Sequence, residues 1–259
     1  MKEEIRKTKV PNLLTKVKRT AKNKGVRHLA SVVFQKIQNR IMISVKTPFW
    51  FNYYRFFKSS QTFEFQQYSY EYFYHKYNTT WHNERAVEIP IVWQIVGNNH
   101  GKILEIGNVL SHYFEVSHDI VDKYEKAPRV INIDLTEIHL SQQYDLVVSI
   151  STLEHVGWDE DPKRRIMLNE NQKIRQAIDK LRTLLNPGGR IVITVPVGYN
   201  PHLDFLLKNE QVKFGKLFCL KRISKDNRWI ETTWKDIENS KFNSPFPFAN
   251  GLVIGIIET

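Results

Sequence analysis

The sequence lacks the features that would place the chain in several common protein classes. Its 259 residues hold one cysteine, Cys219, so no disulfide can form within the chain. No run of about 18 apolar residues occurs, and we expect no transmembrane helix. The first 27 residues are polar and basic, without the apolar core of a secretory signal peptide. A single thiol fits a reducing compartment, and we expect a cytoplasmic protein.

Net charge is also absent from most of the chain. Residues 47–259 hold 25 basic and 25 acidic side chains, whereas residues 1–46 hold 13 basic and two acidic ones. The excess of +11 therefore lies on an N-terminal arm whose apolar residues recur at helical spacing over 11–45. We expect an amphipathic basic helix on an anionic membrane surface, with a solvated extension as the alternative. A neutral body offers no positive groove, so we do not expect nucleic acid as the partner.

Aromatic side chains are concentrated in residues 47–82, where no periodicity predicts secondary structure. This segment is either a connector that packs on the body or an interfacial patch. We therefore divide the chain into a basic arm (1–46), an aromatic-rich connector (47–82) and an α/β domain (83–259).

The α/β domain is predicted from short apolar runs that end in small or polar residues, as buried parallel strands do. These runs span 102–107, 118–122, 129–134, 144–150 and 190–195. Helices are expected over 84–96 and after Asp161, and Asn186-Pro-Gly-Gly189 predicts a stop and turn. Further strands near 217–223, 228–233 and 250–258 follow, two of them as an antiparallel hairpin at the sheet edge.

Polar residues at the ends of these strands are expected to meet in one crevice. A glycine there, Gly107, lets backbone approach a ligand closely. A carboxylate after the second strand suits ribose hydroxyls, and Asp122 and Glu125 are equal candidates for it. The remaining polar residues at strand ends are Glu105, Asn108, Asp134, Ser151, Glu154 and His155.

This set resembles the class I S-adenosylmethionine-dependent methyltransferases, through Leu104-Glu-Ile-Gly107 and through Leu185-Asn-Pro-Gly-Gly-Arg-Ile-Val-Ile193. The resemblance implies a Rossmann-like sheet of seven mostly parallel strands, the last antiparallel, with helices on both faces. It also implies an enzyme that binds S-adenosylmethionine. The implied cofactor-binding residues are Glu105, Gly107, Asn108, Asp122, Asp134, Ser151 and Glu154.

One departure from the family is the loop after the first strand, where Asn-Val-Leu-Ser follows Gly107 in place of further glycines. Either this loop turns differently, with Asn108 at positive φ, or cofactor binding is weakened or lost. Other predicted site residues have a purely structural alternative. Glu105 could cap a helix, Asp134 could be a turn residue, and Glu154 could form a hydrogen bond with loop backbone.

For the methyl acceptor we expect an oxygen atom, because the Asn-Pro-Pro-Tyr signature of many amino-group methylating relatives is absent. His155 is the candidate general base, since histidine titrates near neutral pH; its alternative is a packed histidine. Expected acceptor-binding residues are Arg85, Tyr199, Asn200, His202 and Asn250, although Arg85 and Glu88 could instead form a surface pair. No metal site is predicted.

These residues predict a methyltransferase acting on a small molecule, a glycan or a lipid-linked sugar, on the cytoplasmic face of a membrane. One alternative is a non-catalytic scaffold of the same fold that keeps the membrane- or partner-binding arm. Another is an RNA methyltransferase whose arm holds phosphates. The sequence does not set the oligomeric state.

Overall fold

The computed structural model describes residues 47–158 and 170–258, and the predicted basic arm lies outside them. The chain divides into two compact units, one through Asn52 and one from Tyr53 onward. Of the first unit only 47–52 are described, and they begin helix α3 (Thr47–Phe57). No described helix has the length and apolar character needed to cross a membrane. The division into arm, connector and domain stays a prediction.

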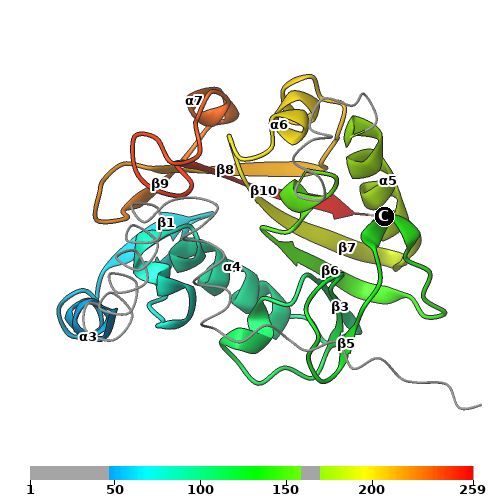
Figure 1. Cartoon of the computed structure of the whole chain (residues 1–259), viewed down its shortest axis with the longest axis horizontal. Coiled ribbons are helices and arrows are strands. Elements are labelled where there is room, and N and C mark those ends of the chain that lie inside the picture. Colours follow the sequence, from blue (N-terminus) through cyan, green and yellow to red (C-terminus); the bar gives the residue numbers. More distant parts are fainter. Residues whose placement is uncertain (1–46, 159–169, 259) are drawn as a thin grey trace, which may run out of the picture. The chain divides into compact units, whose positions relative to one another are not determined.

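The second unit is built on one sheet with the order β5-β4-β3-β6-β7-β10-β8-β9 (Figure 1). The strands are β3 (Ile103–Ile106), β4 (Asp119–Val121), β5 (Val130–Ile131), β6 (Tyr144–Ile150), β7 (Leu185–Pro196), β8 (Lys216–Arg222), β9 (Trp229–Thr232) and β10 (Gly251–Glu258). The five strands from β5 to β7 are parallel, and β10 runs antiparallel between β7 and β8. The mostly parallel sheet with an antiparallel last strand is thus confirmed.

The expected count of seven strands is wrong, because β9 adds an eighth. It pairs antiparallel with β8 and forms the predicted hairpin at the sheet edge. The hairpin is predicted from two neighbouring segments of the chain, whereas the number of strands in the sheet depends on whether the second of them joins it.

The turn predicted at Asn186-Pro-Gly-Gly189 is a bulge inside β7 and does not precede the strand. Leu185 pairs with Tyr144, and the next pair is Arg190 with Leu146. A β-carbon on Gly189 would lie 2.9 Å from the Tyr144 carbonyl oxygen, so glycine is needed for the strands to stay this close. The glycines that suggest a stop therefore allow the pairing to continue.

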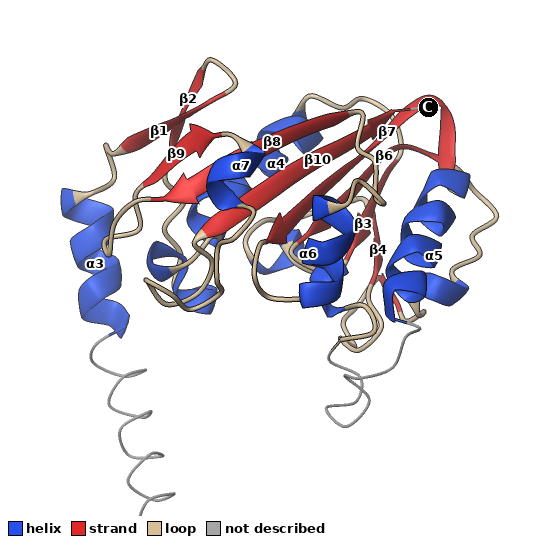
Figure 2. Cartoon of the chain, turned by 90° about the horizontal axis from the view of Figure 1, so that it is seen from above, coloured by secondary structure: helices blue, strands red, loops and turns tan. Residues whose placement is uncertain are grey.

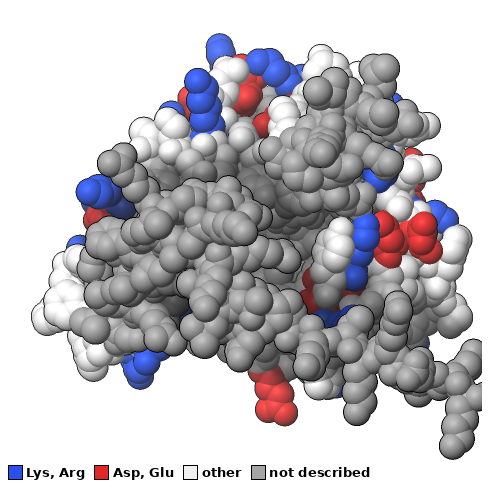
Figure 3. Space-filling model, viewed as in Figure 1, with Lys and Arg blue, Asp and Glu red and all other residues white. Residues whose placement is uncertain are grey.

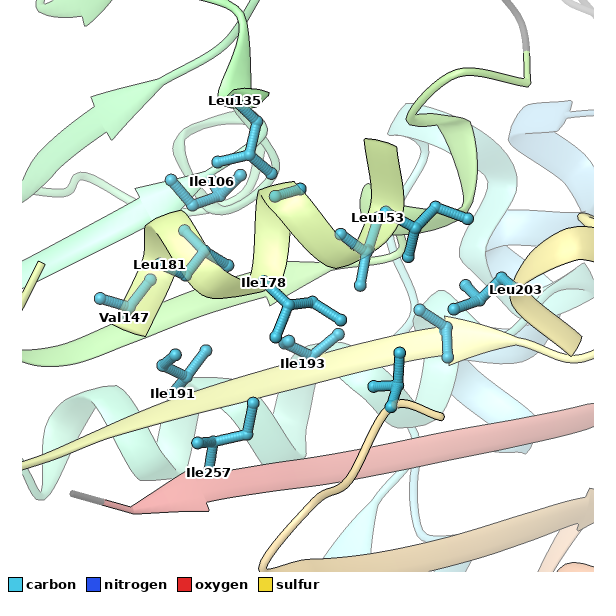
Figure 4. Close-up of a cluster of buried hydrophobic side chains, with 14 of the residues drawn as sticks. Ile106, Leu135, Val147, Leu153, Ile178, Leu181, Ile191, Ile193, Leu203 and Ile257 are labelled. Carbon is cyan, nitrogen blue, oxygen red and sulfur yellow. The ribbon is translucent and has the colours of Figure 1, made fainter. Parts of the chain in front are cut away.

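Three helices cover one face of the sheet: α5 (Glu170–Thr183), α6 (Pro201–Lys208) and α7 (Trp234–Ile237) (Figure 2). Figure 4 shows Ile178 and Leu181 of α5 and Leu203 of α6 directed toward side chains of β6 and β7. The start of the helix predicted after Asp161 lies outside the described residues.

The other face is covered by α4 (Arg85–Gly97) and by a hairpin of β1 (Thr62–Phe65) and β2 (Tyr68–Glu71). Pro90 lies inside α4 and has no N–H to donate to the Ala86 carbonyl. That carbonyl instead accepts from the Phe73 N–H at 2.9 Å. Loss of one helical bond is thus offset by a bond to the neighbouring chain.

The aromatic segment from Tyr53 to η2 (Tyr77–His82), a short 3₁₀ segment kinked at Asn78 and Thr79, packs on this second face. Phe63, Phe65 and Tyr72 are buried there, and the Tyr72 hydroxyl accepts from the Trp229 N–H at 2.8 Å. For these residues the first alternative, a segment that packs on the body, is the one observed.

Candidate functional site

A cavity of about 410 Å³ opens at the carboxyl ends of β3, β4, β5 and β6. Its wall is largely apolar, with a few polar groups between the apolar ones, as ligand pockets have. Its lining residues are Ile106, Gly107, Asn108, Val109, Val121, Asp122, Lys123, Tyr124, Ile133, Asp134, Leu135, Thr152, His155 and Val156. Of the predicted cofactor-binding residues, the structure brings Gly107, Asn108, Asp122 and Asp134 to this cavity.

The loop after β3 keeps this cavity open although it has one glycine. Gly107 takes the positive φ, at +83°, and Asn108 does not, so the alternative that places Asn108 at positive φ is wrong. The Asn108 amide is held by Glu125 Oε1 at 2.8 Å. Leu110 is fully buried in the core on the α4 side of the sheet. Leu110 is thus directed away from the cavity, whereas Asn108 and Val109 are part of its wall without closing it.

Glu105 serves this loop and does not line the cavity. Its Oε1 accepts from the N–H groups of Val109 and Leu110 at 2.9 and 2.7 Å. Its Oε2 lies 2.8 Å from His118 Nε2. With both oxygens occupied and no exposure, the predicted contact with a ligand is wrong and the capping role is the one observed.

Asp122 and not Glu125 is the carboxylate that lines the cavity after β4. Its Oδ1 accepts from the N–H groups of Tyr124 and Glu125, and its Oδ2 accepts from the Asn108 N–H at 3.1 Å. Each oxygen has two lone pairs, so Oδ2 retains capacity for one ligand hydroxyl. Glu125 instead holds Asn108 and His112.

Asp134 lines the cavity next to β5 and also begins the one-turn helix η4 (Leu135–Glu137). Its Oδ1 accepts from Thr136, and its Oδ2 pairs with Lys123 Nζ at 2.6 Å. Burial alone would raise the pKa of Asp134, but the hydrogen bonds from Lys123 and Thr136 outweigh it, and the pKa lies below its ordinary value.

The segment after β6 separates two groups of side chains. Thr152, His155 and Val156, around the one-turn helix η5 (Leu153–His155), line the cavity. Ser151 and Glu154 are buried behind it and do not line it, so a direct cofactor contact predicted for them is not observed.

Ser151 belongs to a buried polar network with α4. Glu88 Oε1 accepts from the hydroxyls of Ser151 and Thr194, and its Oε2 pairs with Arg85 at 2.9 Å. The Glu88 side chain has no exposure and that of Arg85 has 12%, so the pair is not a surface bridge. This network joins α4 to the ends of β6 and β7.

Glu154 lies next to this network without a hydrogen bond to it. Its Oε2 has no partner among the described residues, and its Oε1 is 3.7 Å from His155 Nε2. Burial raises the pKa of Glu154 well above its ordinary value; the charge of Glu88 adds to the rise and that of Arg85 opposes it.

An aromatic wall flanks the half-exposed ring of His155. The Tyr199 ring lies edge-on to His155 at 4.9 Å and to Phe242 at 5.0 Å, and His202 lies 5.7 Å from Trp158. Tyr199 and His202 therefore contact the segment after β6, but neither they nor Arg85 line the cavity, and their role in acceptor binding stays a prediction.

The two predicted asparagines have structural roles, and their assignment to acceptor binding is wrong. Asn200 caps α6 through the His202 and Leu203 N–H groups, and its amide donates to the Glu154 carbonyl at 2.8 Å. The Asn250 amide donates to three carbonyls of the loop before β10. Both side chains are buried, and neither lines the cavity.

The sequence-based set lacks several residues of the site, among them Lys123, Thr152 and Thr194. Lys123 directly follows a predicted strand end and Thr152 lies two residues after another, which is a usable signal. Thr194 lies within the buried part of β7, and nothing in the sequence around it indicates its hydrogen bond to Glu88. Among the residues described, no group of three His, Cys, Asp or Glu is placed to hold a metal ion.

No family model matches this sequence, and no curated protein matches it. Solved structures that it resembles include the N-methyltransferase NodS from Bradyrhizobium japonicum WM9 in complex with S-adenosyl-L-homocysteine. That match has 14% identity and a TM-score of 0.41, and covers 68% of this chain and 87% of that one.

Another is the Burkholderia thailandensis 1,6-didemethyltoxoflavin-N1-methyltransferase with bound 1,6-didemethyltoxoflavin and S-adenosylhomocysteine. It has 14% identity and a TM-score of 0.37, with 65% of this chain and 75% of that one covered. A third, from Thermotoga maritima, is an S-adenosylmethionine-dependent and possible histamine N-methyltransferase, with 11% identity, a TM-score of 0.37, and coverage of 62% and 82%. At these scores the function has to come from the site's own geometry.

Proposed function

We propose that the chain is an S-adenosylmethionine-dependent methyltransferase. The observation that carries this proposal is the open cavity beside Gly107, which persists without the usual run of glycines. It lies where ligands bind in open α/β sheets, outside the carboxyl ends of the parallel strands.

The cavity residues fit the parts of this cofactor. Asp122 keeps an acceptor site for ribose hydroxyls, and the apolar side chains of Ile133 and Leu135 suit the faces of an adenine ring. Thr152 and His155 lie on the wall formed by η5 and would meet the methionine part. When bound, the cofactor supplies an electrophilic methyl group on a sulfonium.

We further propose an oxygen acceptor on a small molecule, a glycan or a lipid-linked sugar. His155 lines the cavity, is half-exposed, and lies against Tyr199, so its ring nitrogen can take a proton from an acceptor hydroxyl. The aromatic wall of Tyr199 and Phe242 suits the apolar face of a sugar ring.

Calorimetric titration of the full chain with S-adenosylhomocysteine tests the cofactor. We expect micromolar binding by the wild type and loss of binding in Ile133→Trp, which places an indole in the cavity. Ile230→Trp is the matched control, because Ile230 is 44% exposed on β9. Absence of wild-type binding at millimolar ligand would favour the non-catalytic scaffold.

We propose that the basic arm attaches the protein to the cytoplasmic face of an anionic membrane. Phe56 and Phe57 on α3 are 73% and 75% exposed, and apolar aromatic groups next to a basic segment suit a lipid interface. On the face drawn in Figure 3, the visible acidic and basic side chains of the described residues are interleaved.

Sedimentation with vesicles tests this attachment. We expect binding to phosphatidylcholine vesicles that contain phosphatidylglycerol, and weaker binding after Phe56→Ser with Phe57→Ser. Tyr68→Ser is the control, because Tyr68 is 62% exposed on β2. If the protein binds RNA and does not bind these vesicles, the RNA methyltransferase would be favoured.

A further inference from the structure

The buried groups behind η5 carry more acid than base. Three carboxyl side chains, Glu84, Glu88 and Glu154, are buried around the guanidinium of Arg85. Their charges act on Arg85 strongly enough to raise its pKa despite its burial. With all groups ionised the cluster would hold an excess of negative charge in a low-dielectric region, which is costly.

Glu154 is the member of this cluster that nothing else in the described chain satisfies. Glu88 accepts three hydrogen bonds, and Glu84 accepts one from the Ala249 N–H at 3.2 Å. Glu154 Oε2 has no partner in the described structure although the side chain is buried. A buried carboxyl oxygen without a donor is retained at a cost in stability, and such groups concentrate at functional sites.

The Glu154 carboxyl lies one side chain behind the cavity wall. Its Oε1 is 3.7 Å from Nε2 of His155, which lines the cavity. Thr152, two residues earlier, lines the same wall. The Asn200 amide fixes the Glu154 backbone through its carbonyl. The carboxyl therefore lies behind the part of the wall that the methionine part of the proposed cofactor would meet.

We infer that Glu154 is the counterion of the sulfonium of S-adenosylmethionine, ionising when this cation binds and remaining protonated beside the neutral thioether of S-adenosylhomocysteine. This inference rests on the proposed function. The other charged or titratable groups that act on Glu154 are His155 on η5 and Arg85, Glu84 and Glu88 from α4. A cation in the cavity relieves the acid excess that these groups leave.

The step that follows balances in protons and electrons. Binding of the sulfonium cofactor releases one proton from Glu154. An acceptor oxygen then forms the new O–CH₃ bond, and the electron pair of the broken S–CH₃ bond stays on sulfur. His155 takes the acceptor's hydroxyl proton and can pass it to the Glu154 carboxylate, which is protonated again as the positive charge disappears.

Calorimetry of the full chain tests this inference with S-adenosylmethionine and S-adenosylhomocysteine as the two probes. Titrations are carried out at one pH in phosphate and in Tris, which differ in ionisation enthalpy. The difference between the two measured heats gives the number of protons released on binding. We expect release of up to about one proton with S-adenosylmethionine and none with S-adenosylhomocysteine. The preference for the charged ligand should grow up to about tenfold per pH unit while Glu154 titrates.

Glu154→Gln should abolish the proton release and make the ratio of the two affinities independent of pH. Glu84→Gln is the matched control, because it removes an acid from the same cluster that already has a backbone donor. Proton release that persists in Glu154→Gln or vanishes in Glu84→Gln would assign the role elsewhere. The wild-type comparison of buffers stands even if a variant does not fold.

The two proposals fail in different ways. If neither ligand binds the wild type, the proposed function is wrong. If both bind and release the same number of protons, the cofactor assignment holds and the role given to Glu154 is wrong.

Discussion

Gly107 lies so close to Thr152 that a β-carbon on the glycine would fall 2.2 Å from the threonine hydroxyl oxygen. No side chain is tolerated at that distance, so Gly107→Ala should displace Thr152 and the cavity wall after β6. We expect at least a tenfold loss of affinity for S-adenosylhomocysteine, measured by calorimetry.

Gly188→Ala is the control that distinguishes the effect of the clash with Thr152 from the effect of backbone strain at positive φ. Gly188 has φ of +78°, close to the +83° of Gly107, but a β-carbon there would meet no atom within 4 Å. Both variants carry the cost of an alanine at positive φ, about 1 kcal/mol. Equal affinities in the two variants would show that the contact with Thr152 does not shape the site.

Glu88 is the residue whose loss should destabilise the fold most among the acids of the site. Glu88→Ala removes the acceptor of three hydrogen bonds and leaves the Arg85 guanidinium buried without its ion partner. Breaking a buried pair in this way costs about 3–5 kcal/mol. Urea unfolding followed by circular dichroism measures the loss, and Glu137→Ala, at an exposed site in η4, should leave the midpoint unchanged.

The sequence predicts well those strands whose apolar pattern lies entirely within their own residues. The run Tyr144–Ile150 matches β6 at both ends, because each residue from Leu146 to Ile150 is buried and the segment is apolar except for Asp145 and Ser149. The aromatic hairpin of β1 and β2 gives no comparable signal. Its burial pattern depends on packing against α4 and against β9, and β9 lies far away in the chain.

The same limit applies to the candidate site. Asp122 and Gly107 follow strand ends, so their place at the cavity is predictable from topology. The roles of Asn200 and Asn250 are not predictable in this way. In the sequence, an asparagine that donates to backbone carbonyls cannot be distinguished from one that binds a ligand. Glu105 was misassigned for this reason as well, since its partner His118 lies 13 residues further along.

Arg222 should not tolerate replacement by lysine. Its guanidinium donates to the carbonyls of Ser224, His82, Pro247 and Lys225, which join the β8–β9 turn to two other loops. An ammonium cannot reproduce this planar set of donors. Each buried carbonyl left unpaired costs about 1–3 kcal/mol, and we expect Arg222→Lys to lose at least about 2 kcal/mol in urea unfolding. Arg228→Lys, at a side chain 58% exposed, should change nothing measurable.

Asp204 should make stability fall as the pH rises from about 4 to about 6. Burial raises its pKa from the ordinary 3.8 to about 6, although the Gly198 N–H, 3.0 Å from Oδ2, acts in the opposite direction. Because the folded state holds this proton more tightly than the unfolded state, Asp204 contributes stability below the lower value and loses it above the higher one.

The shift of about two units corresponds to at most about 3 kcal/mol. Asp204→Asn, which keeps an oxygen for the Gly198 N–H, should remove this part of the pH dependence and raise the unfolding free energy at pH 7. Urea unfolding at several pH values between 4 and 7 measures both effects. A variant that keeps the wild-type slope over that range would mean that Asp204 ionises in the folded protein as it does in the unfolded chain.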